Sequence, residues 1–339
     1  MEETEGLRYG LRKRRKKSER PQNVVGVEEL VKAAIAATAG QSRPPRILVF
    51  SGSGLSASSG MSTFSTKGGL YERAQRKFRL QDGKTLFTYG FFDKNRQEAL
   101  AFLAEVFLEA CQAQPAPGHH ALASLASAGR LQRHYTLNID GLAERAGMTT
   151  WHPTLNPNGT TVEMHGNIHH LVCVECETTV PLTTTAARQL RSRKIIPCQS
   201  CSPDTSSSSE SGASALRFKV MMYEDADSEV ITPSDVMDCM EEDTKSCDLV
   251  LWVGISFQQS ASTAYFRKVR NWLREADRLD TVLQAVINPS EDALWNLITA
   301  CCNQQDLNVV EVLESSDITL PRLAEHLLNA KPKVEEDSL

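Results

Sequence analysis

The fold is decided by residues 46–60, which read RILVFSGSGLSASSG. A short apolar run leads directly into a turn with glycines at positions 52, 54 and 60. Such a run is typical of a strand buried on both faces, and glycines after it let the backbone approach a phosphate group. The third glycine comes three residues later than in the usual GxGxxG motif. A nucleotide site is therefore one interpretation, and a tight turn without a ligand is the other.

Strand and helix patterns alternate along the rest of the chain. Strand-like apolar runs occur at 134–140, 216–225, 247–256, 281–288 and 307–313. Apolar residues at helical spacing occupy 27–40, 97–113, 121–132, 262–276 and 318–330. Because strands that alternate with helices form parallel sheets covered on both faces, the sequence predicts an α/β fold with a Rossmann-like parallel sheet.

Three parts are expected along the chain. Residues 1–23 are polar and are predicted to form a disordered basic arm, residues 24–330 one α/β domain, and residues 331–339 an acidic tail. Residues 167–215 lack the alternating rhythm and contain the low-complexity stretch PDTSSSSESGAS (203–214). We therefore expect a small lobe inserted into the domain at about 167–215.

Composition excludes several classes of protein. The 339 residues are 41% hydrophobic and 23% charged, which is ordinary usage for a soluble protein and unlike a wholly disordered chain, a collagen-like fibre or a coiled-coil rod. No run approaches the ~20 apolar residues of a membrane helix. The acidic start MEETEG is unlike a secretory signal. We therefore expect a protein that stays inside the cell.

Charge is unevenly distributed. The net charge is −5, yet residues 12–17 are six consecutive bases, and without them the net charge is −11. Such a run is typical of a nuclear import signal or a nucleic-acid contact, although a solvated arm without either role fits equally well. We expect a nuclear location, with the cytoplasm as the alternative. Direct nucleic-acid binding is not expected outside the arm.

Four of the nine cysteines form two CxxC pairs separated by 21 residues. An odd number of cysteines without a secretory signal does not indicate a disulfide scaffold. Two tight CxxC turns suit one tetrahedral zinc ion, and four thiolates leave no position for a reactive water. The sequence therefore predicts a structural zinc site made by Cys173, Cys176, Cys198 and Cys201.

Residues beyond the glycine turn resemble the sirtuins, the NAD-dependent protein deacylases. The turn continues as GMSTFSTKGGLY (60–71), with the spacing of the sirtuin motif GAGxSxxxGIPDFRxxxGL. In the family's order there follow HYTLNIDGLAERAG (134–147), VEMHG (162–166), the two CxxC pairs, LRFKVMMYED (216–225), DLVLWVGIS (248–256) and AVIN (285–288). The resemblance covers roughly residues 25–328.

This resemblance implies an NAD-dependent enzyme that removes acyl groups, with acetyl the first candidate, from protein lysines. The products would be nicotinamide and O-acyl-ADP-ribose, and histones would be one candidate substrate. By resemblance His165 is the general base, a task for which its pKa near neutrality is suited. Asn138 and Asp140 would orient the ribose and recognise nicotinamide. The residues expected at the NAD site are Gly52, Ser53, Gly54, Ser56, Phe64, Asn138, Asp140, Gly254, Ser256 and Asn288.

Several positions depart from the family pattern. Ser62, Thr63 and Ser65 replace the proline, aspartate and arginine of PDFR, and Leu137 replaces the glutamine of QNID. Further departures are Ile255 in the late loop and Tyr223 in the substrate-groove motif. Two hypotheses remain: a divergent deacylase with a modified ribose pocket, or a sirtuin-fold binding or scaffold protein with weak or lost catalysis.

The acyl group is also undecided. Sirtuins that prefer acidic acyl chains carry a characteristic tyrosine and arginine after the first helix of the small lobe. Tyr89 and Arg96 lie near that part of the chain, without a definite match.

Overall fold

A six-stranded parallel sheet forms the centre of the larger domain. The computed structural model describes residues 24–38, 43, 45–201, 215–301 and 307–329. The strand order is β3-β2-β1-β7-β8-β9, and every neighbouring pair is parallel. The predicted Rossmann-like sheet is therefore confirmed. The strands are β1 (Ile47–Ser51), β2 (Leu131–Thr136), β3 (Thr161–Glu163), β7 (Leu249–Val253), β8 (Leu283–Ile287) and β9 (Val310–Val312).

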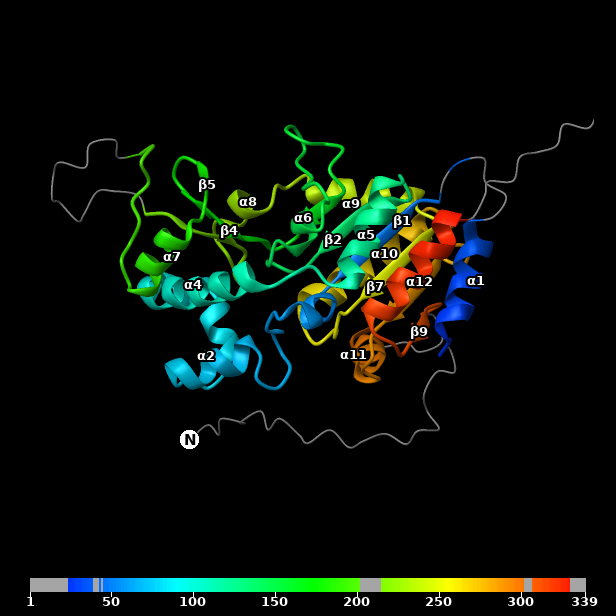
Figure 1. Ribbon diagram of the computed structural model, residues 1–339, viewed down its shortest axis with the longest axis horizontal. Coiled ribbons are helices and arrows are strands. Elements are labelled where there is room, and N and C mark those ends of the chain that lie inside the picture. Colours follow the sequence, from blue (N-terminus) through cyan, green and yellow to red (C-terminus); the bar gives the residue numbers. More distant parts are fainter. Residues whose placement is uncertain (1–23, 39–42, 44, 202–214, 302–306, 330–339) are drawn as a thin grey trace, which may run out of the picture.

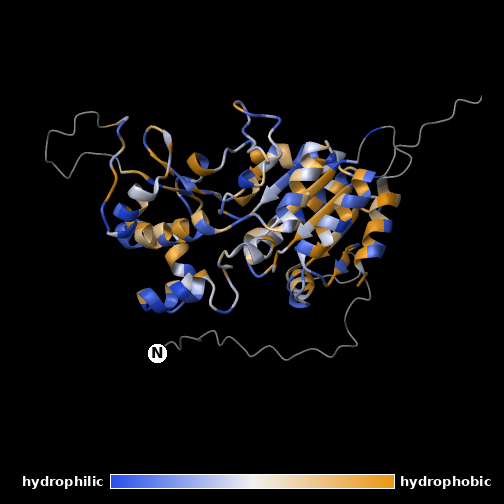
Figure 2. Ribbon diagram, viewed as in Figure 1, coloured by the Kyte–Doolittle hydropathy of each residue, from blue (hydrophilic) through white to orange (hydrophobic). Residues whose placement is uncertain are grey.

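Helices cover both faces of this sheet because alternate residues of each strand point to opposite sides. On β1, Ile47 and Val49 join one apolar cluster with α1, α5 and α12, while Leu48 and Phe50 join another with α9, α10 and α11. Figure 2 shows these strands as a largely hydrophobic layer. The helices are α1 (Val27–Thr38), α5 (Pro117–Ser127), α9 (Val236–Ser246), α10 (Ser260–Glu275), α11 (Asp292–Cys301) and α12 (Ser316–Asn329).

A second lobe lies at the opposite end of the molecule from α1 and α12 (Figure 1). Its antiparallel sheet has the order β5-β4-β6, so it continues past residue 215 into β6. An apolar cluster unites this sheet with helices from residues 70–112, which come much earlier in the chain. The lobe's elements are α2 (Leu70–Phe78), η3 (Gly83–Phe87), α3 (Tyr89–Lys94), α4 (Arg96–Gln112), β4 (Gly166–Val172), β5 (Thr179–Pro181), α7 (Thr184–Arg191), β6 (Arg217–Val220) and α8 (Ser228–Ile231).

One local expectation differs from the structure. The strand predicted at 134–140 lies earlier, at Leu131–Thr136, so LNID belongs to the loop that follows it. The short elements η2 (Ser53–Ser59) and α6 (Leu142–Arg145) follow strands β1 and β2. No described helix is long and apolar enough to cross a membrane. The predicted basic arm at 1–23 and the tail at 331–339 lie outside the described residues.

Candidate active site

The glycine turn lies where the sheet order reverses direction. Strand β1 has β2 on one side and β7 on the other, and Gly52 and Gly254 follow β1 and β7 directly. Open parallel sheets bind ligands in the crevice outside the carboxyl ends of strands at such a switch point. This is the place where the sequence predicted a nucleotide.

The two glycine loops touch through their backbones. The Gly54 amide donates to the Gly254 carbonyl oxygen at 2.9 Å. A Cβ on Gly54 would lie 2.6 Å from the Gly254 Cα, and Gly254 itself has φ +61°. These glycines are therefore required by the contact between loops, whatever ligand lies beside them. The predicted residue Ser53 begins η2, directly between Gly52 and Gly54.

Ser56 connects the predicted ribose residues. Its hydroxyl donates to Asp140 Oδ2 at 2.6 Å and accepts from Asn138 Nδ2 at 3.2 Å. Asn138 Nδ2 also donates to the Gly52 carbonyl oxygen at 3.0 Å. Asn138 and Asp140 are each only 6% exposed. Although LNID is a loop rather than a strand, the side chains of Asn138 and Asp140 both bond to Ser56.

A buried histidine that the sequence analysis did not single out completes this network. His119 Nδ1 accepts from the Ala116 amide at 3.2 Å, so the proton of the neutral ring is on Nε2, which lies 3.3 Å from Ser56 Oγ. Burial lowers the pKa of His119, and this keeps the ring neutral. The signal that could have found it is HH at 119–120, close after a proline-rich turn.

His165 lies in the step between β3 and β4. Its Nδ1–H donates to the Leu137 carbonyl oxygen at 3.1 Å, so the neutral ring presents Nε2 as a proton acceptor. Burial lowers the pKa of His165, while the bond to Leu137 opposes that shift. A neutral imidazole with a fixed tautomer is the state that a general base needs.

Leu137 shows how one departure from the family pattern is accommodated. Its side chain is 8% exposed and belongs to an apolar cluster with Met164 and Ile255, another departing position. Its carbonyl group still holds His165. The substitution thus removes a polar side chain while the backbone contact to the histidine is kept.

The loop that contains Ser62 and Phe64 is held by residues the sequence analysis missed. Glu109 on α4 accepts from the Ser62 amide and from Arg73 Nη1, both at 2.6 Å, and Arg73 Nη1 also donates to Ser62 Oγ at 3.0 Å. Burial works against the charge of Glu109, but the bonds from Ser62 and Arg73 outweigh it and lower the pKa. Since these residues lie 36 and 47 positions before Glu109, no local pattern signals the pairing.

Two asparagines hold the late loop. Asn288 Nδ2 donates to the Ile255 carbonyl oxygen at 3.1 Å, and Asn296 Nδ2 donates to that of Ser256 at 3.0 Å. Asn288 was among the predicted residues, whereas Asn296 was not. Both amides fix the backbone around the predicted Ser256.

A cavity of about 10 Å³, enough for about one water-sized sphere, lies behind the network. Its lining residues are Leu55, His119, His134, Thr136, Asn138, Asp140, Gly141, Ala143 and Glu163.

Glu163, at the edge of this cavity, has an altered pKa. Burial raises the pKa of Glu163 to about 7, although Asn167 Nδ2 donates to its carboxyl at 2.7 Å. The carboxyl is therefore substantially protonated at neutral pH.

The four predicted cysteines come together in the second lobe. Their sulfur atoms all lie within 4.8 Å of one another, and Cys173–Cys201 and Cys176–Cys198 are each 3.6 Å apart. Tetrahedral zinc with Zn–S bonds of ~2.3 Å places its sulfur ligands ~3.8 Å apart, so the donor set fits zinc. Four thiol ligands leave no open position for substrate.

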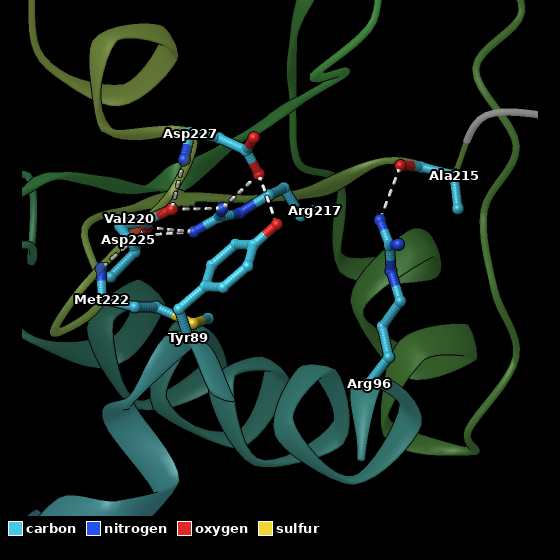
Figure 3. Close-up of polar contacts among 8 residues, drawn as sticks. All are labelled: Tyr89, Arg96, Ala215, Arg217, Val220, Met222, Asp225 and Asp227. Carbon is cyan, nitrogen blue, oxygen red and sulfur yellow. Dashed lines mark hydrogen bonds and ion pairs between the residues drawn. The ribbon is translucent and has the colours of Figure 1, made fainter. Parts of the chain in front are cut away.

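Tyr89 and Arg96 have structural contacts (Figure 3). Tyr89 donates its hydroxyl hydrogen to Asp227 Oδ2 at 3.1 Å, and Arg96 donates to the Ala215 carbonyl oxygen at 3.0 Å. Arg217, fully buried, forms a two-bond pair with Asp225 at 2.7 and 2.9 Å. These contacts link α3, α4 and the segment around β6, and so they stabilise the lobe.

Comparison with known proteins decides the family. The model of the Sir2 family matches residues 52–260, which is more than half of the chain. The chain belongs to the Sir2 family. The match begins at the glycine turn and extends to the start of α10.

Curated relatives are similar to parts of this Sir2 chain. "NAD-dependent deacetylase sir2D" of Dictyostelium discoideum is 29% identical over 213 residues, 62% of this chain and 35% of that protein. "NAD-dependent protein deacylase" of Desulfosudis oleivorans is 36% identical over 131 residues, 39% of this chain and 43% of that protein. The chain thus spans less than half the length of each of these two relatives.

Solved structures share the fold. One described as a Sir2 homolog–NAD complex has a TM-score of 0.62 at 20% identity, covering 89% of this chain and 93% of that chain. Another, described as the structural basis of sirtuin substrate affinity, has a TM-score of 0.61 at 19% identity, covering 89% and 99%. The arrangement of sheet and second lobe is therefore that of Sir2 proteins.

Proposed function

We propose that this chain is an NAD-dependent protein lysine deacylase that acts on acetyl-lysine or a related acyl-lysine. The observation that carries the proposal is the neutral His165, fixed through Leu137, beside the Ser56–Asn138–Asp140 network at the switch point of the sheet. Relatives named NAD-dependent deacetylase or deacylase support it.

NAD fits the residues present. The glycine loops bring backbone amides to the carboxyl ends of β1 and β7, and the predicted residues Gly52, Ser53, Gly54, Ser56, Gly254, Ser256 and Asn288 would hold the dinucleotide there. Bound NAD supplies a reactive ribose carbon and nicotinamide as leaving group. Asn138 and Asp140, in fixed orientation, would bind ribose and carboxamide, and Phe64 would cover the pocket.

His165 then accepts a proton at Nε2 from a ribose hydroxyl, which lets the sugar take the acyl group. Because Nδ1–H is held by the Leu137 carbonyl, the histidine keeps its orientation while Nε2 changes protonation. With NAD bound, nicotinamide would leave and the acyl group would pass from the lysine amine to ADP-ribose, so that acyl-lysine, NAD and one water would give lysine, nicotinamide and O-acyl-ADP-ribose. This assignment keeps His165, Asn138 and Asp140 as the residues at the reaction centre.

The test is nicotinamide release from NAD in the presence of an acetyl-lysine peptide, comparing the wild type with His165→Ala. We expect release by the wild type at least 100-fold above the variant, since a positioned base contributes about 10²–10⁴-fold. Equal release by both would overturn the enzyme and favour a binding or scaffold protein, to which the loss of charged side chains at Thr63 and Ser65 also points.

Zinc would hold the second lobe through Cys173, Cys176, Cys198 and Cys201 without entering the reaction. The measurement is metal content per chain, for which one zinc is expected.

We further propose the domain organisation given above: an arm at 1–23, a sirtuin-type domain at 24–330, and a tail at 331–339. The zinc-binding insert, at about 167–215, would form one part of the second lobe.

Histones are proposed as substrates. Relatives named as histone deacetylases support this substrate class, among them HST3 of Saccharomyces cerevisiae, 26% identical over 198 residues.

The nucleus is proposed as the location of the protein. The basic run at 12–17 would be the import signal. A fluorescent fusion tests it: replacing the six bases with alanine should shift the protein from nucleus to cytoplasm, and unchanged nuclear signal would contradict the assignment.

A further inference from the structure

Three side chains from separate segments meet through one hydroxyl group. The hydroxyl groups of Tyr71 and Tyr223 are 2.9 Å apart, and Gln259 Nε2 donates to the Tyr71 hydroxyl oxygen at 3.1 Å. Tyr71 lies on α2, Tyr223 follows β6, and Gln259 precedes α10. We name these three residues the Tyr71 junction. It ties the second lobe to the larger domain.

Tyr71 is also bound to the loop that contains Phe64. Its amide donates to the Phe64 carbonyl oxygen at 3.1 Å, and the two rings are 5.7 Å apart. The neighbouring Leu70 amide donates to the Thr63 carbonyl oxygen at 2.8 Å. The position of this loop, in which Phe64 would cover the proposed NAD pocket, is therefore linked to Tyr71.

Tyr223 connects the junction to the segment beside His165. The Met221 amide donates to the His165 carbonyl oxygen at 2.9 Å, two residues before Tyr223. The backbone of Tyr223 bonds to Phe87 at 2.8 Å and to Tyr89 at 2.9 Å, which fixes it against the lobe. A displacement of Tyr71 would thus be transmitted to the backbone next to the proposed base.

Gln259 connects the junction to the late loop. It lies three residues after Ser256, whose carbonyl is held by Asn296. The side of the junction opposite the lobe is therefore anchored to the predicted NAD loop. Each of the three residues is thus linked to a different part of the proposed site. Tyr71 is linked to the Phe64 loop, Tyr223 to the segment beside His165, and Gln259 to the loop that contains Ser256.

The surroundings of Tyr71 restrict its movement. Its ring packs edge-on against Phe87 at 5.5 Å, and a Cβ on Gly83 would lie 1.7 Å from the Tyr71 carbonyl oxygen. Burial and the bond to Tyr223 raise the pKa of Tyr71, so the hydroxyl stays protonated. The Tyr71 hydroxyl can then accept a hydrogen bond from Gln259 while it shares another with the Tyr223 hydroxyl.

We propose that Tyr71 is a positioning residue that couples the binding of NAD to the binding of the acyl-lysine substrate. This rests on the proposed function. A ligand that binds against the Phe64 loop would restrain Tyr71, and through Tyr223 and Gln259 it would also restrain the segments beside His165 and Ser256. The second ligand would then meet segments already restrained and bind more tightly, and the effect is reciprocal.

The experiment measures the affinity of the full chain for ADP-ribose, an unreactive probe without nicotinamide, by calorimetry with and without saturating acetyl-lysine peptide. In the wild type the peptide should tighten ADP-ribose binding, and the ratio of the dissociation constants without and with peptide is the coupling factor. Tyr71→Phe and Tyr223→Phe should each reduce the coupling factor about 2- to 10-fold, the range for one neutral hydrogen bond. The double variant should lose little more than Tyr71→Phe, because Tyr71→Phe already removes the bond to Tyr223 together with the acceptor for Gln259.

Tyr265→Phe, on α10 outside the junction, is the matched control and should keep the wild-type factor. Gln259→Met removes the hydrogen bond to the Tyr71 hydroxyl and leaves both tyrosines in place, and it should also reduce the coupling factor. ADP-ribose binding that the peptide does not tighten, or an unchanged factor in all junction variants, overturns the coupling while the NAD site stands. A wild type that does not bind ADP-ribose at all overturns the proposed function and the coupling with it.

Discussion

Nδ1 of His165 lies 3.1 Å from the carbonyl oxygen of Leu137, a residue whose side chain departs from the sirtuin pattern. The backbone of a divergent position thus determines which nitrogen of the histidine is free. Since every peptide unit has a carbonyl group, this contact tolerates side-chain change. Burial lowers the pKa of His165 and this contact opposes the shift, so the two together set the pH range in which the site can act.

The rate of NAD-dependent deacylation should fall only at acidic pH. Burial lowers the pKa of His165, so the neutral base persists below the ordinary value of about 6.5 and is lost as the pH falls through the lowered pKa. The measurement is kcat/KM for acetyl-lysine peptide between pH 5 and 9. An acidic limb centred above pH 7 would contradict the assignment of His165 as base.

Gly54→Ala should destabilise the protein and weaken NAD binding. The added Cβ would lie 2.6 Å from the Gly254 Cα and 2.8 Å from its carbonyl oxygen, so both loops must move apart. Overpacking of this kind costs about 1–3 kcal/mol, to be read from urea denaturation. Gly90→Ala is the control, because a Cβ there meets nothing within 4 Å. Equal effects of the two substitutions would refute the close contact.

Glu163→Gln should stabilise the protein at pH 8 but not at pH 4. The folded pKa of about 7 exceeds the unfolded value of about 4.3, so the wild type loses stability as pH rises between these values. Gln keeps the acceptor for Asn167 and carries no charge, which predicts a gain of up to ~4 kcal/mol above pH 7. Thermal unfolding across this range measures it, with exposed Glu229→Gln as control. A gain that does not depend on pH would contradict the pKa.

Arg73→Met should loosen the Ser62 loop and weaken NAD binding. The Arg73 side chain is 31% exposed and its guanidinium bridges Ser62 and Glu109, so its loss leaves a half-buried carboxylate without its cation. We expect the free energy of unfolding to fall by about 1–3 kcal/mol and the KM for NAD to rise. Arg76→Met, which removes an exposed pair with Glu72, should change little. A double-mutant cycle with Glu109→Gln should be non-additive, and additivity would exclude the bridge.

Removal of zinc should unfold the second lobe. Metal binding by a site of four cysteine thiolates contributes folding free energy directly, so a chelator or Cys176→Ser should lower the melting temperature and abolish bound zinc. Cys111→Ser, on α4 outside the cluster, should keep both near wild type. A full complement of zinc in Cys176→Ser would show that the metal is bound elsewhere.

The sequence could predict those features of the fold and of the candidate site whose residues lie close together in the chain. The strand before Gly52 and the two CxxC turns are local patterns, and both were confirmed. Ser56, Asn138 and Asp140 were found through the family resemblance, and the structure brings them together. Their roles with NAD stay predictions.

What the sequence could not supply were pairings between distant segments. The Arg73–Glu109 bridge leaves no periodic signal, and neither does the Tyr71 junction, which joins residues 152 and 188 positions apart. Leu137 was interpreted from its side chain, whereas its backbone holds His165. Such contacts depend on tertiary packing.

Helix α4 contacts both the cysteine cluster and the Ser62 loop. One of its faces joins the apolar cluster that contains Cys173 and Cys198, while its Glu109 holds the amide of Ser62. The position of the Ser62 loop therefore depends on how α4 packs against the cysteine pairs, which lie outside the pocket itself.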